Sequence, residues 1–212
     1  KKAVYGASII FFMNILAAVI SYITRIVLAR ELGPYNYGLF YSVFTFVAFF
    51  LFFRDLGLNT ALVKHIPEFL VEKEYHKIKT AIFSVLTLQL LSSLLFTIPL
   101  FFLAEYLAVN YFGDKAAAKI LQILLIYIFG SIFFRLFKSI FQGFQRMKIY
   151  SLFDFLKNSS FLLLTFIFLK QGFGYYSPAF AYALLCFLIA IALLPLLLKI
   201  FPFFCYIIIG VL

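Results

Sequence analysis

The stretch Ala81–Leu103, AIFSVLTLQLLSSLLFTIPLFFL, contains no charged residue and decides the fold class. At 1.5 Å per residue its 23 residues would form a helix of about 35 Å, which exceeds the hydrocarbon layer of a bilayer, about 30 Å thick. Because lipid offers the backbone no hydrogen-bond partner, a segment of this length must be helical. The stretch therefore predicts a transmembrane helix.

Further apolar stretches lie on both sides of this segment. They are Val4–Leu28, Gly38–Phe53, Ile120–Phe141, Leu152–Leu169 and Pro178–Leu198. Gly38–Phe53 is short for a membrane span, and we expect it to continue as a helix through Arg54 and Asp55 towards Ile66. Together with Ala81–Leu103, these stretches predict six transmembrane helices.

The composition of the chain agrees with a membrane-embedded fold. Hydrophobic residues make up 66% of the 212 residues, charged residues make up 12%, and the mean hydropathy is +1.10. These values are far from those of soluble domains, and the long stretches lack the short alternating segments of a transmembrane barrel. We therefore predict an all-α, polytopic membrane helix bundle with the lipid bilayer as its main partner.

The last residues of the chain begin another apolar run. Phe203–Leu212 is too short to cross a bilayer, so we interpret it as the start of a truncated seventh helix in a longer protein, after a six-helix unit at residues 1–202. Cys186 and Cys205 lie in apolar stretches and are predicted to be packing residues. His65 and His76 have no third ligand at a metal-like spacing, so we predict no metal site.

The distribution of Lys and Arg predicts the orientation in the membrane. If the N-terminus is cytoplasmic, nine of the Lys and Arg residues in or near the loops are cytoplasmic and four are outside. This excess on the cytoplasmic side agrees with the positive-inside rule. This topology and the attraction of anionic headgroups account for the net charge of +10, so nucleic acid is not needed as a partner. The sequence contains no Gly-rich phosphate loop and no nucleophile with a base in reach, and we expect no enzymatic activity.

Polar and charged residues within the apolar stretches recur every three or four positions, which places them on one face of each helix. The candidate binding residues chosen on this basis are Arg25, Arg54, Asp55, Arg135, Lys138, Asp154, Lys157 and Asn158. We predict that these faces meet in a hydrated cavity. This cavity would have a net charge of +2, which favours an anion. The residues counted are the cations Arg54, Arg135, Lys138 and Lys157 and the carboxylates Asp55 and Asp154. The alternative is that each charge lies near a helix end and extends to the nearest membrane surface.

Two short patterns resemble a known family. The first is ARELGPYNYGLF at residues 29–40, and the second is DLGLNTALVK at residues 55–64. Both resemble the signature of polysaccharide-biosynthesis membrane proteins, the oligosaccharide flippases of the multidrug/oligosaccharidyl-lipid/polysaccharide exporter superfamily. The segment QGFQRMK at residues 142–148 is similar to a weaker motif of that family. The motif positions carried over are Arg30, Gly33, Pro34, Gly38, Asp55, Gly57 and Lys64.

The resemblance implies a function beyond what the residues alone indicate. Such proteins have two six-helix lobes, so this chain would be the N-terminal lobe and would need the missing C-terminal lobe of the same chain as a partner. It would turn a lipid-linked anionic oligosaccharide of the polyprenyl-phosphate type from the cytoplasmic to the outer leaflet of the cell membrane by alternating access. The cationic cavity would hold the phosphate groups. The resemblance implies no cofactor, and it leaves open whether H⁺ or Na⁺ is a coupling ion.

Two other functions remain open from the sequence. The first is a multidrug or metabolite antiporter in which Asp55 and Asp154 bind H⁺ or Na⁺, although a net positive cavity disfavours an organic cation. The second is a membrane scaffold within a glycan-assembly complex. Polar faces that pack together without a cavity would favour the scaffold.

Overall fold

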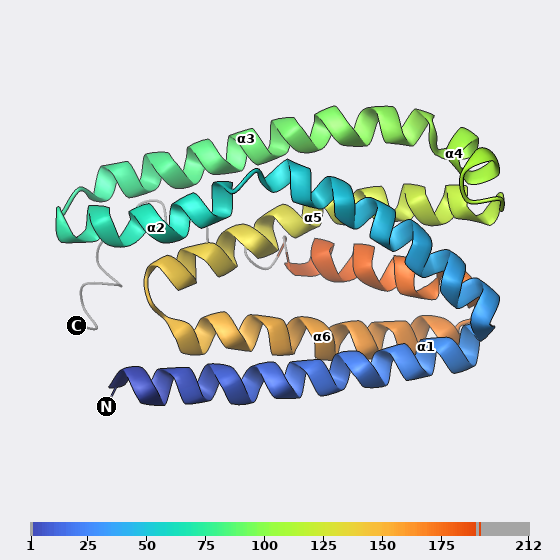
Figure 1. Ribbon diagram of the computed structural model, residues 1–212, viewed down its shortest axis with the longest axis horizontal. Helices are drawn as coiled ribbons and strands as arrows, with labels where there is room; N and C mark the ends of the chain where they lie inside the picture. Colours follow the sequence, from blue (N-terminus) through green and yellow to red (C-terminus); the bar gives the residue numbers. More distant parts are fainter. Residues whose placement is uncertain (1, 190, 192–212) are drawn as a thin grey trace.

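The computed structural model describes residues 2–189 and 191, and all of its regular elements are helices (Figure 1). They are α1 (Lys2–Asp55), α2 (Leu58–Val71), α3 (Tyr75–Phe102), α4 (Ala104–Asn110), α5 (Ala116–Gly143), α6 (Met147–Lys170) and the 3₁₀ turn η1 (Gly174–Tyr176), which opens an apolar helix over Gly174–Ile189. Four helices, α1, α3, α5 and α6, contain segments long and apolar enough to cross a membrane. The all-α, multi-pass prediction is confirmed. The predicted end of the sixth stretch at Leu198, the run Phe203–Leu212 and Cys205 lie outside the described residues.

Helix α1 consists of two helices that run in opposite directions. Gly33 interrupts it with φ 72° and ψ 166°, a conformation that glycine adopts without steric cost, and Pro34 follows. We call residues 2–32 the first arm and residues 34–55 the second arm. The ribbon of α1 accordingly reverses and returns on the other side of the molecule (Figure 1). The two predicted stretches Val4–Leu28 and Gly38–Phe53 fall in separate arms.

The second stretch continues as a helix through Arg54 and Asp55, as expected, but the expected continuation to Ile66 is wrong. The second arm ends at Asp55 because Leu56 and Gly57 have positive φ values of 43° and 78°, and α2 begins at Leu58. Two successive left-handed residues cannot continue a right-handed helix. The sequence signal for this break was Gly57, which we read only as a motif position.

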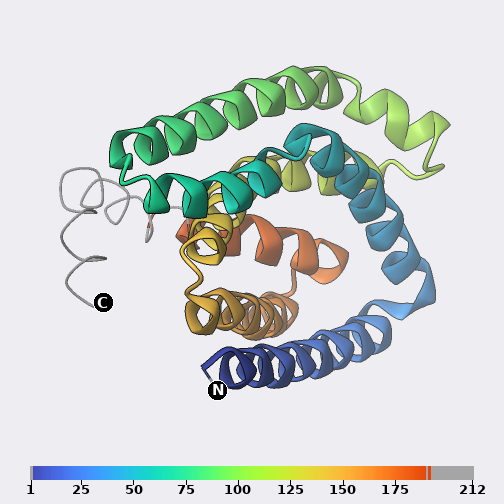
Figure 2. The ribbon, with the colours of Figure 1, turned by 60° about the vertical axis from the view of Figure 1, so that its left-hand side comes forward.

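Helix α5 is the centre of the bundle. Of its most apolar segment, 72% is buried inside the protein, against 11% for the corresponding segments of α1 and α6. One core cluster joins α5 to the second arm, α4 and the apolar helix Gly174–Ile189, and a second cluster joins it to α2 and α3. The first arm lies beside α6, on the opposite side of the molecule from α3 (Figure 2). The central position of α5 brings its side chains within reach of every neighbouring helix.

The apolar helix Gly174–Ile189 approaches α5 closely at Gly130. A Cβ atom added to Gly130 would lie 2.5 Å from Cβ of Cys186, so only glycine fits at this crossing. Cys186 is 2% exposed and forms no disulfide, as expected of a packing residue.

The connection between α2 and α3, residues 72–74, is polar. Lys77 forms an ion pair with Glu74, and the hydrogen bond from Lys77 lowers the pKa of the Glu74 carboxyl. His65 pairs with Glu68 at 2.6 Å on an exposed face. Among the described residues, no group of His, Cys, Asp and Glu could hold a metal ion.

Candidate functional site

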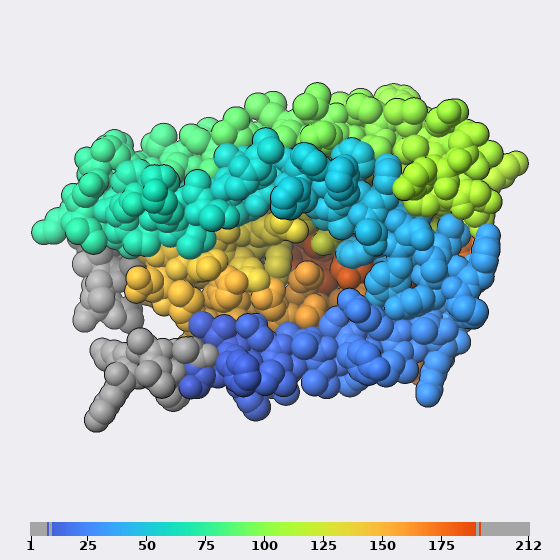
Figure 3. Space-filling view, in the orientation of Figure 1, coloured from blue at the N-terminus to red at the C-terminus, as the bar shows by residue number. Residues whose placement is uncertain are grey.

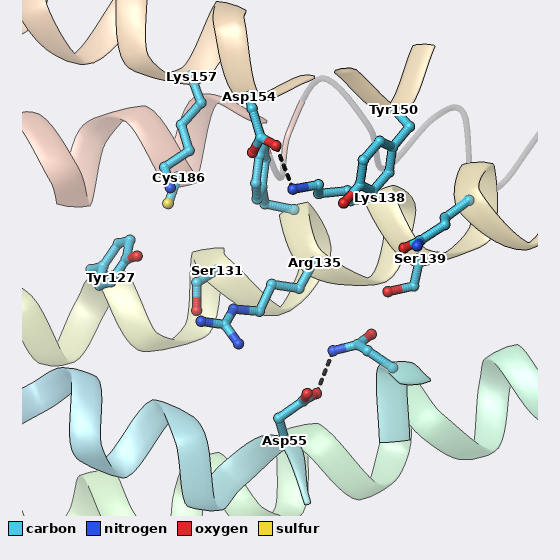
Figure 4. Close-up of a pocket in the computed structure, with 13 residues that line it drawn as sticks. Asp55, Tyr127, Ser131, Arg135, Lys138, Ser139, Tyr150, Asp154, Lys157 and Cys186 are labelled. Carbon is cyan, nitrogen blue, oxygen red and sulfur yellow. Dashed lines mark hydrogen bonds and ion pairs between the residues drawn. The ribbon is translucent and has the colours of Figure 1, made fainter. Parts of the chain in front are cut away.

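A hollow lies between the first arm of α1 and the second arm with α2, and α5, α6 and the apolar helix Gly174–Ile189 form its floor (Figure 3). Between these elements is a cavity of about 310 Å³, which we call the charged cavity (Figure 4). Its walls come from the end of the second arm, from α2, α5 and α6, and from Cys186. The lining residues are Asp55, Asn59, Tyr127, Ser131, Phe134, Arg135, Lys138, Ser139, Gln142, Tyr150, Asp154, Lys157 and Cys186.

Lys138 and Asp154 form an ion pair across the cavity between α5 and α6. The Lys138 Nζ atom is 2.5 Å from Oδ2 of Asp154, and it also lies 4.5 Å from the centre of the Tyr150 ring. Both charged side chains are about three-quarters buried. Each charge therefore compensates the other where water is scarce.

The other two cations of the cavity have no carboxylate partner. Arg135 points from α5 into the space between α6 and the second arm, and no described residue forms an ion pair or hydrogen bond with its guanidinium (Figure 4). Lys157 of α6 lies 5.3 Å from the centre of the Phe134 ring and likewise has no ion pair within residues 2–189. Three cations and two carboxylates leave the cavity with a net charge of +1.

Asp55 lines the same cavity, but its hydrogen bonds come from side chains of α2 and α3. Its Oδ1 atom accepts a hydrogen bond from the Asn59 amide of α2 and another, of 3.0 Å, from Nε2 of Gln89 on α3. Gln89 is completely buried. The carboxylate is thus held by two neutral donors.

The charged cavity gathers five of the eight predicted binding residues and leaves out three. Arg54 is 1% exposed, and its Nη1 atom donates to the Ile128 carbonyl at 2.7 Å and to Ser131 Oγ at 2.8 Å. It therefore joins the second arm to α5 instead of lining the cavity. This placement corrects the expected cavity charge of +2.

The remaining two predicted residues lie on or near the first arm. Arg25 is exposed and close to Tyr41 of the second arm. Asn158 donates to the Ala17 carbonyl at 3.2 Å and so ties α6 to the first arm. Neither lines the charged cavity, so the structure does not bring all eight residues together.

Four polar lining or supporting residues were missed from the sequence, namely Tyr127, Ser139, Tyr150 and Gln89. Tyr127 lies one helical turn before Ser131 on the polar face of α5, so extending that face by one turn would have found it. Gln89 could have been identified because it is a polar amide within the charge-free stretch Ala81–Leu103, where a polar side chain needs a partner. Tyr150 likewise lies one helical turn before Asp154 on the polar face of α6, so the same extension of that face would have found it.

Three of the seven motif residues shape the backbone. Gly33 and Pro34 form the reversal in α1, and Gly57 forms the break before α2. Arg30 and Lys64 are exposed and do not line the charged cavity. Asp55 alone belongs both to the motif and to the cavity.

The long apolar helices and the charged cavity enclosed between them define an α-helical, multi-pass membrane protein. A family model described as "Polysaccharide biosynthesis protein" matches residues 3–209, and the chain belongs to this family, as the motifs predict. The chain is 30% identical over 196 residues to the "Uncharacterized membrane protein MJ1068" of Methanocaldococcus jannaschii, a match that covers 87% of this chain and 39% of that protein. The chain thus spans about two fifths of the length of this relative. No solved structure matches it.

Proposed function

We propose that the complete membrane protein moves a lipid-linked anionic oligosaccharide from the cytoplasmic to the outer leaflet of the cell membrane, for the synthesis of a surface polysaccharide or glycan. The observation that carries this proposal is the charged cavity, where Arg135 has no ion-pair partner among the described residues. An ionised group within a membrane helix is costly and needs a partner or water. A phosphate or diphosphate group supplies that partner, because a guanidinium binds it with two parallel hydrogen bonds.

The cavity also bears on the two alternative functions. Three cations against two carboxylates favour an anionic substrate over an organic cation, which supports a flippase in preference to a multidrug exporter. A scaffold has no need for an open space of about 310 Å³ between polar helix faces. Membership of the polysaccharide biosynthesis family supports a glycan as the transported group.

In this proposal the N-terminus is cytoplasmic and the described helices belong to one lobe of a two-lobe transporter. The second lobe comes from the rest of the protein and closes the cavity from the other side. Rocking of the two lobes then exposes the phosphate site to each leaflet in turn, while the lipid tail remains in the bilayer.

The test is a transport measurement with the full-length protein in liposomes. A fluorescent glycan on a polyprenyl diphosphate is incorporated in both leaflets, and its transfer is followed by chemical quenching from outside. We expect Arg135→Gln to slow transfer at least about tenfold, which corresponds to about 1.4 kcal/mol. Lys115→Gln is the matched control, because it removes an exposed cation far from the cavity. Absence of transfer by the unmodified protein, or equal rates for Arg135→Gln and the control, would count against the proposal.

A further inference from the structure

Asp55 and Arg135 line the same cavity but do not pair with each other. A carboxylate and a guanidinium that share a space of low dielectric constant normally form a short, charge-assisted hydrogen bond. Lys138 and Asp154 do so in this cavity, at 2.5 Å. The separation of Asp55 from Arg135 therefore has a cause in the surrounding structure.

The cause lies on the side of α2 and α3. Oδ1 of Asp55 accepts hydrogen bonds from the side-chain amides of Asn59 and Gln89, and both amides are more than nine-tenths buried. Two donors on one oxygen fix the direction of a short side chain. Asp55 is thereby turned towards α2 and α3, and Arg135 approaches from α5.

Gln89 has no other role in the described structure. It is fully buried in a helix whose apolar segment is among the most hydrophobic in the protein, and its Oε1 atom has no hydrogen-bond partner. It does not line the charged cavity, so it cannot contact a ligand there. Its single side-chain hydrogen bond within residues 2–189 goes to Asp55.

We propose that Gln89, with Asn59, is a positioning residue that keeps the Asp55 carboxylate away from Arg135 and so leaves the guanidinium available to an anion. The inference rests on the anion-binding cavity of the proposed function and identifies what maintains its charge. Without the two amide donors, Asp55 forms an ion pair with Arg135. The Asp55 carboxylate then competes with the phosphate group for the N–H donors of the Arg135 guanidinium.

The experiment measures binding of radiolabelled farnesyl diphosphate to the full-length protein in nanodiscs. We expect Gln89→Leu to raise the Kd about tenfold, because leucine has no hydrogen-bond donor to hold Asp55. Gln122→Leu on α5 is the matched control, since Gln122 is outside the cavity, and it leaves the Kd unchanged. Asp55→Asn in the Gln89→Leu background restores the affinity, because an amide does not neutralise Arg135.

The outcomes separate this inference from the proposed function. If Arg135→Gln binds the probe as well as the unmodified protein, the anion site itself is wrong. If Arg135→Gln loses binding but Gln89→Leu behaves like its control, only the positioning role is overturned. A loss in Gln89→Leu that Asp55→Asn does not reverse also overturns it, because that result indicates general damage to the fold. If Gln89→Leu does not fold, the same pair of measurements is made on Asn59→Leu, with and without Asp55→Asn, and is read in the same way.

Discussion

The charged cavity differs sharply from a second, larger hollow along the second arm of α1. This aromatic groove of about 1020 Å³ has no ionisable Asp, Glu, Lys or Arg in its lining. It is lined by Tyr35, Gly38, Leu39, Tyr41, Ser42, Thr45, Phe46, Phe49, Phe50, Tyr111 and Phe112. The charged cavity has less than a third of this volume but contains five charged side chains. Volume alone therefore does not indicate the binding site, because acyl chains fill an aromatic groove at no electrostatic cost, whereas buried charges need a polar partner.

Arg54, which is buried against α5, and Arg135, which lines the charged cavity, give the largest expected contrast. Arg54→Ala removes a side chain with 1% exposure and two hydrogen bonds to α5, so we expect a loss of about 3 kcal/mol in the free energy of unfolding. Arg135→Ala should cost less than about 1 kcal/mol but abolish anion binding, since this guanidinium has no partner among the described side chains. Thermal unfolding in detergent and diphosphate binding measure the two effects. Equal destabilisation by both changes would contradict the distinction.

Substitutions at two glycines compare how tightly the helices pack beside the charged cavity and in the aromatic groove. Gly130→Ala would place a Cβ atom 2.5 Å from Cβ of Cys186, and we expect a cost of about 2 kcal/mol. Gly38→Ala in the groove meets no atom within 4 Å and should be neutral or stabilising by about 0.5 kcal/mol, because alanine favours a helix. The two melting temperatures are compared directly. A similar shift for both variants would show that the crossing at Cys186 relaxes without cost.

The ion pair between α5 and α6 offers a test of how charge would control anion binding at the proposed site. Asp154→Asn leaves Lys138 charged and unpaired, and we expect the affinity for a diphosphate to rise about threefold to fivefold. Asp114→Asn is the control, since Asp114 lies in the loop before α5, does not line the charged cavity, and accepts hydrogen bonds from the Ala116 backbone N–H and the Tyr35 hydroxyl. The measurement is a titration at low and high salt, and the gain should shrink at high salt. Weaker binding by Asp154→Asn would instead indicate that the ion pair is needed for the shape of the site.

The smallest effect is expected in the aromatic groove. Phe49 is 58% exposed and contacts the rings of Phe50 and Phe53, so Phe49→Leu should cost about 0.5 kcal/mol. Anion affinity should not change. A fall in anion affinity upon this substitution would mean that the groove and the charged cavity are parts of one site.

The apolar stretches predicted the helices well, because their length and lack of charge leave no alternative in lipid. Gly33 and Pro34, which were identified in the sequence as motif positions, are the residues at which α1 reverses. The break at Leu56 and Gly57 was not predicted, since one glycine in an apolar helix is common in membranes and leucine gives no sign of its positive φ.

The candidate site was predicted in part for a similar reason. Helical periodicity places Arg135, Lys138, Asp154 and Lys157 on inner faces, and these four residues do line one cavity. The same rule cannot separate Arg54 from Asp55, which are adjacent in sequence and differ by 100° around the helix. Which of them is buried against α5 depends on how the second arm rotates in the bundle, and that is decided by packing and not by local sequence.

The interruption after Asp55 has a consequence for the backbone. A helix that stops within an apolar layer leaves the carbonyl oxygens of its last turn without amide partners, and hydrocarbon supplies none. One of them, the carbonyl of Arg54, accepts a hydrogen bond of 3.3 Å from Ser92 Oγ. Any carbonyl of this turn that finds no donor in the protein needs water, which the neighbouring hollow can supply. Water at this depth is therefore demanded by the main chain as well as by the ionised side chains, and filling the hollow with apolar side chains would destabilise the end of α1 even if every charge were removed.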